Sequence, residues 1–285
     1  MHPVQNGIPQ GSPVSPILAA FYTAELLEMF TPPNHSQPPL PTSPDSPTNV
    51  HLFMYGDDGK LFVWSKSLEN STILLKNAYL EAEAWLKRAG LSPDISKREL
   101  MHDSRRRNHN SNPSIVFTDS DGTTRTVTPE ATVRWLSVHI DRKLRFERHV
   151  KILAASGENT VAALTVVANT VRGLSHGHRR RLYAACVVPK ILYACPAWWN
   201  GTRYQSKPLE KVQNRALRLI CASFRTTPIT ALEIEASIPP IIHQIHLHTK
   251  RCAIRFNKFD TNNATIREPL ARRPAGLSGQ VNKWL

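Results

Sequence analysis

The run from His51 to Trp64, with the sequence HLFMYGDDGKLFVW, constrains the fold of this chain more than any other segment. Two apolar arms of β-forming residues flank a central Gly-Asp-Asp-Gly, which is the pattern of a β-hairpin. The turn of such a hairpin would hold two neighbouring carboxylates, Asp57 and Asp58, away from the sheet. Adjacent carboxylates repel each other unless a positive group lies beside them. Mg²⁺ is a suitable partner, because it needs only one or two protein carboxylates. An ordinary hairpin is the alternative interpretation, since Asp-Gly is a favoured turn pair.

A second motif, GIPQGSPVSPIL, begins at Gly7. Its prolines and glycines indicate a stiff, bent loop. The apolar residues from Ile17 to Phe30 predict a helix after this loop, with Ser15 as its N-cap and Pro16 as its first residue. A loop that enters a helix N-terminus presents free backbone N–H groups, which suit a phosphate or the edge of a base pair. A plain N-capped helix would show the same pattern.

In this order, the two motifs resemble those of the palm subdomain of reverse transcriptases. The loop is similar to a family motif with the pattern Pro-Gln-Gly-x-x-x-Ser-Pro, and the hairpin is similar to the family's Tyr-x-Asp-Asp. Viral RNA-copying polymerases also carry Gly-Asp-Asp, but their preceding motif lacks Pro-Gln-Gly. The resemblance is strongest for reverse transcriptases of non-LTR (LINE-like) retrotransposons, of which this chain would be the C-terminal palm and thumb portion. The matching residues are Pro9, Gln10, Gly11, Ser15, Pro16, Tyr55, Gly56, Asp57 and Asp58.

The resemblance implies roles for several of these residues. Asp57 would be the main ligand of Mg²⁺ and Asp58 the second carboxylate, and both would act in catalysis. Tyr55 would pack near the primer end, while Gln10 and Gly11 would line the nucleotide and template side.

The family also carries a lysine near the incoming triphosphate, after a helix that ends in Gly-Leu. Lys97 takes that place in this chain, where a cation would stabilise charge on the pyrophosphate leaving group or donate a proton to it. A solvated lysine at a strand edge is the alternative.

Two further segments are expected to contact nucleic acid. The segment from Val133 to Asp141 resembles the family's primer-grip hairpin, with Trp135 as the contact residue, although Ser137 stands where the family has glycine. A basic stripe opposite the apolar face of a helix predicted at 208–224 could follow the phosphates of a template–primer duplex. It consists of Lys207, Lys211, Arg215 and Arg218. A solvated charged face is the other interpretation of this stripe.

The charge distribution supports a polyanionic partner. The net charge is +14, yet residues 1–100 contain 7 Lys+Arg and 10 Asp+Glu, whereas residues 101–285 contain 29 and 12. A metal site joined to a basic surface suits an enzyme that acts on a nucleic-acid backbone. A basic balance alone also fits solubility or nonspecific polyanion binding.

The predicted fold class is α+β, with a partial polymerase palm of antiparallel sheet and packed helices, followed by a mostly helical thumb and connection region. We predict the palm over 1–148, the helical region over 149–260 and a tail over 261–285. Residues 31–49 contain seven prolines, and we predict that they form a disordered insertion. Helices are predicted at 68–89, 149–174, 178–198, 208–224 and from 229 onward, and strands at 115–117 and 125–127.

The cysteines and the hydropathy pattern bear on location. Cys186, Cys195, Cys221 and Cys252 form no Cys-x-x-Cys pair, so neither a disulfide framework nor a zinc knuckle is indicated. No uninterrupted apolar stretch has membrane length, and the N-terminus has no signal pattern. We expect an intracellular protein of the nucleus or cytoplasm, not secreted and without a membrane partner.

The resemblance implies an RNA-directed DNA polymerase that uses Mg²⁺, an RNA template, a DNA primer and deoxynucleoside triphosphates. The family's first catalytic aspartate and its fingers precede the loop motif, so we expect this chain to be inactive alone. One alternative is a noncatalytic, basic nucleic-acid-binding remnant of a retroelement. Another is a chain that does not fold, because the palm sheet lacks its first strand and leaves an exposed edge.

Overall fold

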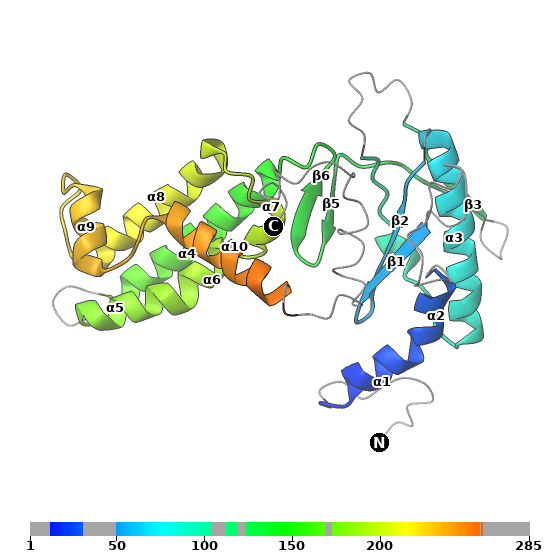
Figure 1. Cartoon of the computed structure of the whole chain (residues 1–285), viewed down its shortest axis with the longest axis horizontal. Helices are drawn as coiled ribbons and strands as arrows, with labels where there is room; N and C mark the ends of the chain where they lie inside the picture. Colours follow the sequence, from blue (N-terminus) through cyan, green and yellow to red (C-terminus); the bar gives the residue numbers. More distant parts are fainter. Residues whose placement is uncertain are drawn as a thin grey trace. The chain divides into compact units, whose positions relative to one another are not determined.

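The computed structural model describes residues 12–30, 50–65, 67–103, 112–118, 123–168, 173–256 and 258. The chain divides into two compact units, Met1–Leu136 and Ser137–Leu285. Helices and short antiparallel sheets are both present, so the predicted α+β class is confirmed (Figure 1). Gln10, Gly11, the predicted insertion at 31–49 and the predicted tail lie outside the described residues.

The N-terminal unit contains two antiparallel hairpins and three α-helices among its described residues. β1 pairs with β2, and β3 pairs with β4, which confirms the predicted strands. In order, the elements are α1 (Ser15–Tyr22), α2 (Ala24–Met29), β1 (Val50–Tyr55), β2 (Asp58–Val63), α3 (Leu68–Arg88), the 3₁₀ turn η2 (Ile95–Lys97), β3 (Ile115–Thr118), β4 (Thr124–Val127) and β5 (Thr132–Trp135).

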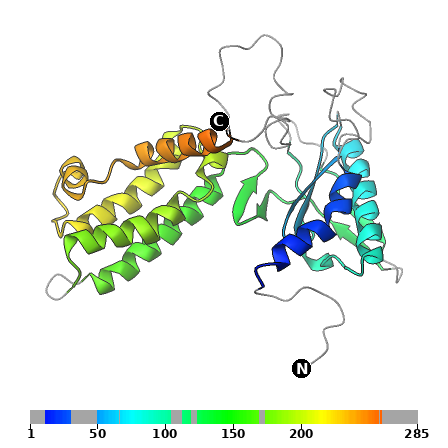
Figure 2. The same ribbon diagram turned by 60° about the horizontal axis from the view of Figure 1, so that its bottom comes forward.

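Helix α3 is the main support of the β1–β2 hairpin (Figure 1, Figure 2). Its sequence specifies both ends, because the hydroxyl of Ser67 accepts the backbone N–H of Asn70, and Gly90 follows with a φ of 72°. Ala78, Ala82 and Trp85 are buried on its inner face, as the apolar periodicity predicts. They share one core cluster with α2 and β1, so one face of the hairpin is covered.

The helix predicted at Ile17–Phe30 is in fact two helices. It begins at Ser15, which makes Ser15 the first helical residue rather than the cap, and Val14 is the N-cap. Thr23 separates α1 from α2, with a ψ of 1°, and its hydroxyl donates to the carbonyl four residues earlier at 2.9 Å. Such a bond competes with the regular helix. Pro16 is in the first turn, where its missing N–H costs nothing.

The C-terminal unit is mostly helical, as predicted. The described elements are β6 (Val138–Asp141), α4 (Glu147–Val167), α5 (His176–Leu182), the π-helical turn η3 (Tyr183–Val187), α6 (Val188–Ile191), α7 (Cys195–Trp198), α8 (Arg203–Ile220), α9 (Ile229–Ala236) and α10 (Ile241–Phe256). The core of the unit forms where α4, α6 and α8 pack together.

Three predicted helices differ from the observed ones. The helix predicted at 178–198 is interrupted at residues 192–194, where Ala194 has a φ of 52°. The helix predicted from 229 is divided by Pro239 and Pro240, which cannot continue the hydrogen-bond ladder. The helix predicted at 208–224 begins five residues earlier, at Arg203.

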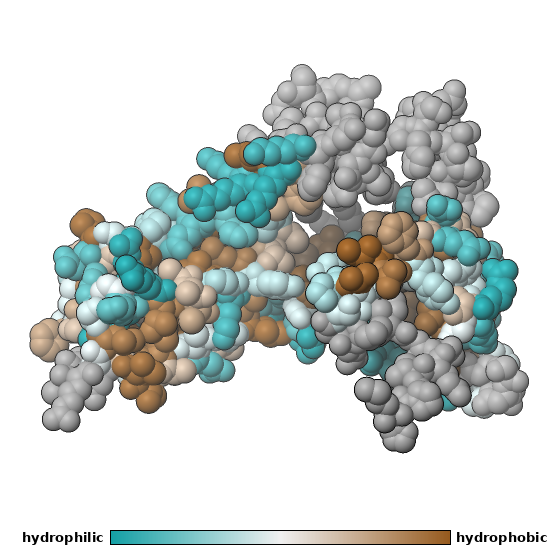
Figure 3. Space-filling model, turned by 90° about the horizontal axis from the view of Figure 1, so that it is seen from below, coloured by the Kyte–Doolittle hydropathy of each residue, from teal (hydrophilic) through white to brown (hydrophobic). Residues whose placement is uncertain are grey.

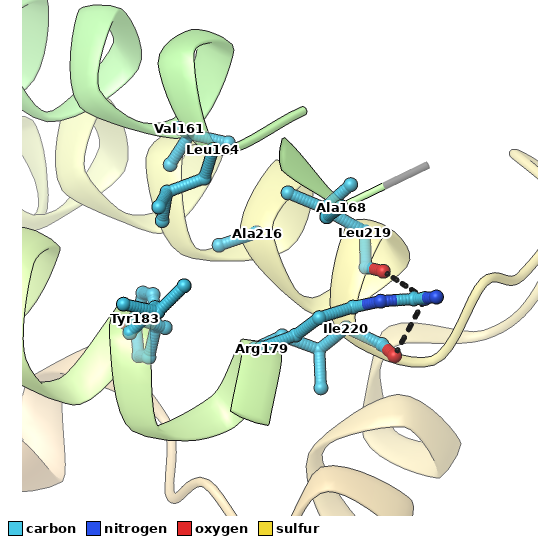
Figure 4. A pocket seen from close by; sticks show the side chains of 9 residues that line it. Val161, Leu164, Ala168, Arg179, Tyr183, Ala216, Leu219 and Ile220 are labelled. Atoms are coloured by element: carbon cyan, nitrogen blue, oxygen red, sulfur yellow. Dashed lines mark hydrogen bonds between the residues drawn. The ribbon is translucent and has the colours of Figure 1, made fainter. Parts of the chain in front are cut away.

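Arg179 fixes the C-terminal end of α8 (Figure 4). Its guanidinium donates to the carbonyls of Leu219 and Ile220 at 3.1 and 3.4 Å, and its Nε donates to the carbonyl of Leu174. The last carbonyls of a helix have no intrahelical partner, and a cation there also complements the helix dipole. The position of α8 therefore depends on a residue of α5.

Some apolar surface is exposed in both units. Along α1, the exposed apolar side chains include Phe21, which is 77% exposed, and brown surface is visible over this helix in Figure 3. α4 is the one described helix whose length and composition would allow a membrane span, a test that core helices of soluble proteins also pass. Its buried face, with Val150, Leu153 and Val161, belongs to the helical core.

Candidate functional site

The two neighbouring aspartates lie at the tip of the β1–β2 hairpin. Tyr55 pairs with Asp58, which leaves Gly56 and Asp57 as a two-residue turn. Gly56 has a φ of 61°, a region that favours glycine, and its α-carbon faces open space. Asp57 and Asp58 are both exposed, and Tyr55 is 69% exposed. The predicted hairpin is confirmed, and both carboxylates are open to a ligand.

The donor set at this tip suits a hard divalent cation. Asp57 and Asp58 offer carboxylate oxygens, and Mg²⁺ completes its shell with water and substrate phosphates when the protein supplies one or two such groups. In the part of the chain that the structure describes, no group of three or more His, Cys, Asp or Glu residues could hold a metal ion. The pair therefore fits Mg²⁺ bound together with a substrate and does not form a cage of its own.

The outer face of the hairpin brings Trp135 to β2, a contact that the sequence did not predict. Leu61 and Val63 of β2 pack on the core, so Lys60 points to the opposite face. Its Nζ lies 5.1 Å from the ring centroid of Trp135, and burial lowers the pKa of Lys60. The alternation of residues along β2 was the feature of the sequence that could have indicated the outward direction of Lys60. The partner could not be found, because Trp135 is far away in the chain.

Lys97 lies in η2, and its side chain is largely exposed. Its Nζ pairs with Asp94 at 3.2 Å, and its side chain is 82% exposed. The pKa of Asp94 is lowered by hydrogen bonds from Ser96, first, and from Lys97. Within the described residues, no hydrogen bond or ion pair joins Lys97 to the hairpin tip. Lys97 is therefore exposed to solvent but already has Asp94, the N-cap of η2, as its partner.

The four cations of the basic stripe on α8 fall into two groups, according to whether other groups of the protein already interact with them. Arg215 forms an ion pair with Glu158 of α4 at 2.8 Å, and Arg218 is half-buried and donates to the carbonyl of Asn214. Lys207 and Lys211 are exposed and line an open groove of about 360 Å³ between α4 and α8. The other lining residues are Ala154, Ala155, Glu158, Tyr204 and Pro208.

Comparison with known proteins identifies a family whose model covers the hairpin. The family model described as "Reverse transcriptase (RNA-dependent DNA polymerase)" matches residues 1–140. The matched region contains the exposed carboxylate pair, Lys97 and Trp135. This part of the chain belongs to the reverse transcriptase family.

Reverse transcriptase relatives from non-LTR retrotransposons extend the likeness over most of the chain. A "Probable RNA-directed DNA polymerase from transposon BS" of Drosophila melanogaster is 23% identical over 95% of this chain and 28% of its own length. The polymerase from mobile element jockey of Drosophila funebris is 21% identical over 99% of this chain and 29% of its own length. A Pol polyprotein from the R1 4 element of Nasonia vitripennis is 26% identical over 55% of this chain and 39% of its own length.

The chain therefore spans less than half the length of each of these relatives. No solved structure matches it. The helices of the C-terminal unit, α8 included, lie beyond the family match but within the alignments to the BS and jockey polymerases. The β1–β2 hairpin and α8 thus both lie in the part of the chain that aligns with proteins named as RNA-directed DNA polymerases.

Proposed function

We propose that this chain is the part of an RNA-directed DNA polymerase that carries two of its metal-binding carboxylates and part of its nucleic-acid surface. The reaction would be transfer of a deoxynucleotide to a DNA primer on an RNA template. The observation that carries the proposal is the exposed pair Asp57–Asp58 at a two-residue hairpin turn, within the region that matches the reverse transcriptase family.

Asp57 and Asp58 are the proposed Mg²⁺ ligands, with Asp57 as the main one. When bound, the ions would lower the pKa of the primer 3′-hydroxyl and neutralise the leaving group. Tyr55, exposed beside the carboxylates, would pack against the primer end. Lys97, exposed and paired with Asp94, would exchange that partner for a triphosphate and neutralise charge on the pyrophosphate or give it a proton.

The nucleic-acid contacts proposed here come from both units. Trp135 would contact the primer strand, held in place by Lys60 on the neighbouring hairpin. Lys207, Lys211, Arg215 and Arg218 of α8 would face the phosphates, and Gln10 with Gly11 would line the nucleotide and template side. We place the reaction inside the cell, in the nucleus or cytoplasm, where RNA templates and deoxynucleoside triphosphates occur.

We also propose that the chain alone does not extend a primer. Two-metal sites hold both the attacking and the leaving oxygen, and the family uses a further carboxylate for this. No third acidic residue joins Asp57 and Asp58 within the described ranges.

The metal-binding part of the proposal is tested with Mn²⁺ as a spectroscopic substitute for Mg²⁺. Titration of the full chain, with a template–primer and a deoxynucleoside triphosphate present, should show bound Mn²⁺ by electron paramagnetic resonance. Asp57→Asn with Asp58→Asn should abolish that signal, whereas Asp94→Asn, an exposed carboxylate of the same unit, should leave it unchanged. Equal Mn²⁺ binding by the hairpin variant would overturn the proposed metal site.

Primer extension tests the proposed inactivity. We expect no template-dependent product from the full chain with Mg²⁺. Product that Asp57→Asn abolishes would refute the inactivity and at the same time support the assigned carboxylate.

A noncatalytic nucleic-acid-binding remnant is the second candidate. The groove with two exposed lysines favours it, since this surface needs no metal. Its signature would be salt-sensitive RNA binding that is unchanged by Asp57→Asn and by removal of Mg²⁺, together with no Mn²⁺ signal at the hairpin.

A further inference from the structure

We propose that the groove between α4 and α8 binds a single-stranded stretch of nucleic acid, with Lys207 and Lys211 as its phosphate contacts. This inference rests on nucleic acid being the partner of the chain, as the proposed function states. It goes further by naming the form of that partner and by limiting the contacts to two of the four cations in the stripe. It also predicts that binding of nucleic acid in the groove does not require the carboxylates at the hairpin tip.

The charges of the groove select a polyanion. Lys207 and Lys211 are four residues apart on α8, so they share one side of the helix about 6 Å apart along its axis. Both are exposed, and neither has an ion-pair partner within the described ranges. The one acidic residue of the lining, Glu158, is already paired with Arg215 at 2.8 Å. The free charge of the groove is therefore positive.

The ion pair between Arg215 and Glu158 also explains why the arginines are not part of this site. A phosphate would have to displace the carboxylate from Arg215, and the released Glu158 would repel it. Arg218 is half-buried, and its guanidinium already donates to the carbonyl of Asn214. The two lysines can bind phosphates without breaking an ion pair.

The shape of the groove favours one strand over a duplex. Ala154, Ala155 and Pro208 give it an apolar lining. The ring of Tyr204 is held at its hydroxyl by a 2.6 Å bond to the carbonyl of Arg145. A duplex keeps its bases stacked inside and presents phosphates on a convex surface. A single strand can place a sugar or a base against this lining, where stacking on an aromatic ring contributes about 1–3 kcal/mol.

The groove also has the size for such a contact. Its volume of about 360 Å³ falls within the range of sites that hold small organic ligands, roughly 300–1,000 Å³. One nucleotide of a strand is a ligand of this kind, while its neighbours continue into solvent along α8.

The test uses the full chain and fluorescence anisotropy with two probes, a labelled single-stranded oligo-dT and a labelled duplex of equal length, in EDTA at several salt concentrations. Lys207→Gln with Lys211→Gln should weaken binding of the single strand by about tenfold or more at low salt. The slope of log K against log salt should become less negative by about 1.4, since each lost phosphate contact removes about 0.7 from its magnitude for single strands. Binding of the duplex should change less.

The matched control removes the same charge elsewhere on the same unit. Lys250→Gln with Arg251→Gln alters two exposed cations of α10 and should leave the salt slope within error of the parent chain. Circular dichroism melts of both variants should coincide with that of the parent, because all four side chains are exposed. If the melt shows that the lysine variant is unfolded, Lys207→Arg with Lys211→Arg is used instead. This variant keeps both positive charges and should bind the single strand as the parent chain does.

The proposal is overturned if the control pair loses as much affinity as the groove pair, or if the duplex loses as much as the single strand. It is supported if only the groove pair affects single-strand binding. Asp57→Asn with Asp58→Asn distinguishes this inference from the proposed function. If the double variant binds Mn²⁺ as the parent chain does, while the single strand still depends on Lys207 and Lys211, the metal site is contradicted and the groove stays in place.

Discussion

Ala222 follows Cys221, the C-cap of α8, and has a left-handed conformation with a φ of 49°. The backbone N–H of Ser223 bonds to the carbonyl of Arg218 at 3.1 Å, which is the hydrogen bond of a Schellman motif. Glycine is preferred at this position, because a side-chain Cβ is strained there by about 1–2 kcal/mol. The strain is not relieved by packing, since Ala222 is exposed.

We therefore expect Ala222→Gly to stabilise the protein by about 1 kcal/mol, measured as the free energy of unfolding in urea. Ala163→Gly, at an exposed position within α4, is the control and should destabilise by about 1 kcal/mol. The same sign for both substitutions would contradict the conformational explanation.

His149 is the residue whose protonation should govern stability at mildly acidic pH. Its side chain is buried, and its Nδ1 accepts the backbone N–H of His139 at 3.4 Å. Burial, and secondly the nearby His139, hold the pKa of His149 below its ordinary value of 6.5. As the pH falls below 6.5, the unfolded chain takes up this proton and the folded one does not. Stability is then lost from pH 6.5 down to the lowered pKa and is constant below it.

The loss should amount to about 1.4 kcal/mol for each unit by which the pKa is lowered. Urea unfolding at a series of pH values should show a slope between pH 7 and 5 that is reduced in His149→Asn. His178→Asn, at an exposed histidine, should keep the slope of the parent chain. An unchanged slope in His149→Asn would rule out this histidine as the cause.

At the scale of elements, the contact between α4, α6 and α8 depends on one glycine. A Cβ placed on Gly157 would lie 2.5 Å from Cγ2 of Ile191 and 3.0 Å from Cγ1 of Val212. Both neighbours are fully buried, so neither can move away without repacking the core.

Gly157→Ala should destabilise the C-terminal unit by about 1–3 kcal/mol, because overpacking outweighs the gain in helix propensity. Gly177→Ala, whose new Cβ would lie more than 4 Å from any side chain outside its immediate neighbours, should stabilise by about 0.5–1 kcal/mol. Thermal melts of the two variants should therefore shift in opposite directions. Parallel shifts would show that helix propensity, and not packing, decides the effect.

The start of α8 shows where local sequence rules fail. From Pro208 we predicted that the helix begins at residue 208, yet α8 begins at Arg203. The additional turn is fixed from outside the helix, since Tyr204 and Gln205 both donate to the carbonyl of Arg145. These bonds offset the backbone hydrogen bond that Pro208 cannot make. The turn also brings Tyr204 beside the basic groove.

At the scale of the whole molecule, each unit has a core of its own. The N-terminal unit is built around α3, with Trp85 at its centre, and around the β3–β4 hairpin. The larger core of the C-terminal unit surrounds α4 and α8. Separate cores predict separate cooperative unfolding.

Hydrogen exchange measured by mass spectrometry should show this independence. Gly157→Ala should reduce the protection of amides in α4 and α8 and leave the protection of α3 unchanged. An equal loss in α3 would mean that the chain unfolds as one unit. The same data show whether the N-terminal unit is stably folded, which bears on the alternative of an unfolded chain.

The sequence by itself determined the β1–β2 hairpin, α3 and the apolar and basic faces of α8. Turn residues, caps and side-chain period act between near neighbours, and a reader of the sequence sees them together. The tertiary structure decided the contact of Lys60 with Trp135, the early start of α8 and the pairing of Arg215 with Glu158. Each of these joins residues that are far apart in the chain. Such contacts depend on how complete elements pack, because burial and hydrogen-bond satisfaction are properties of the packed unit and not of any one segment.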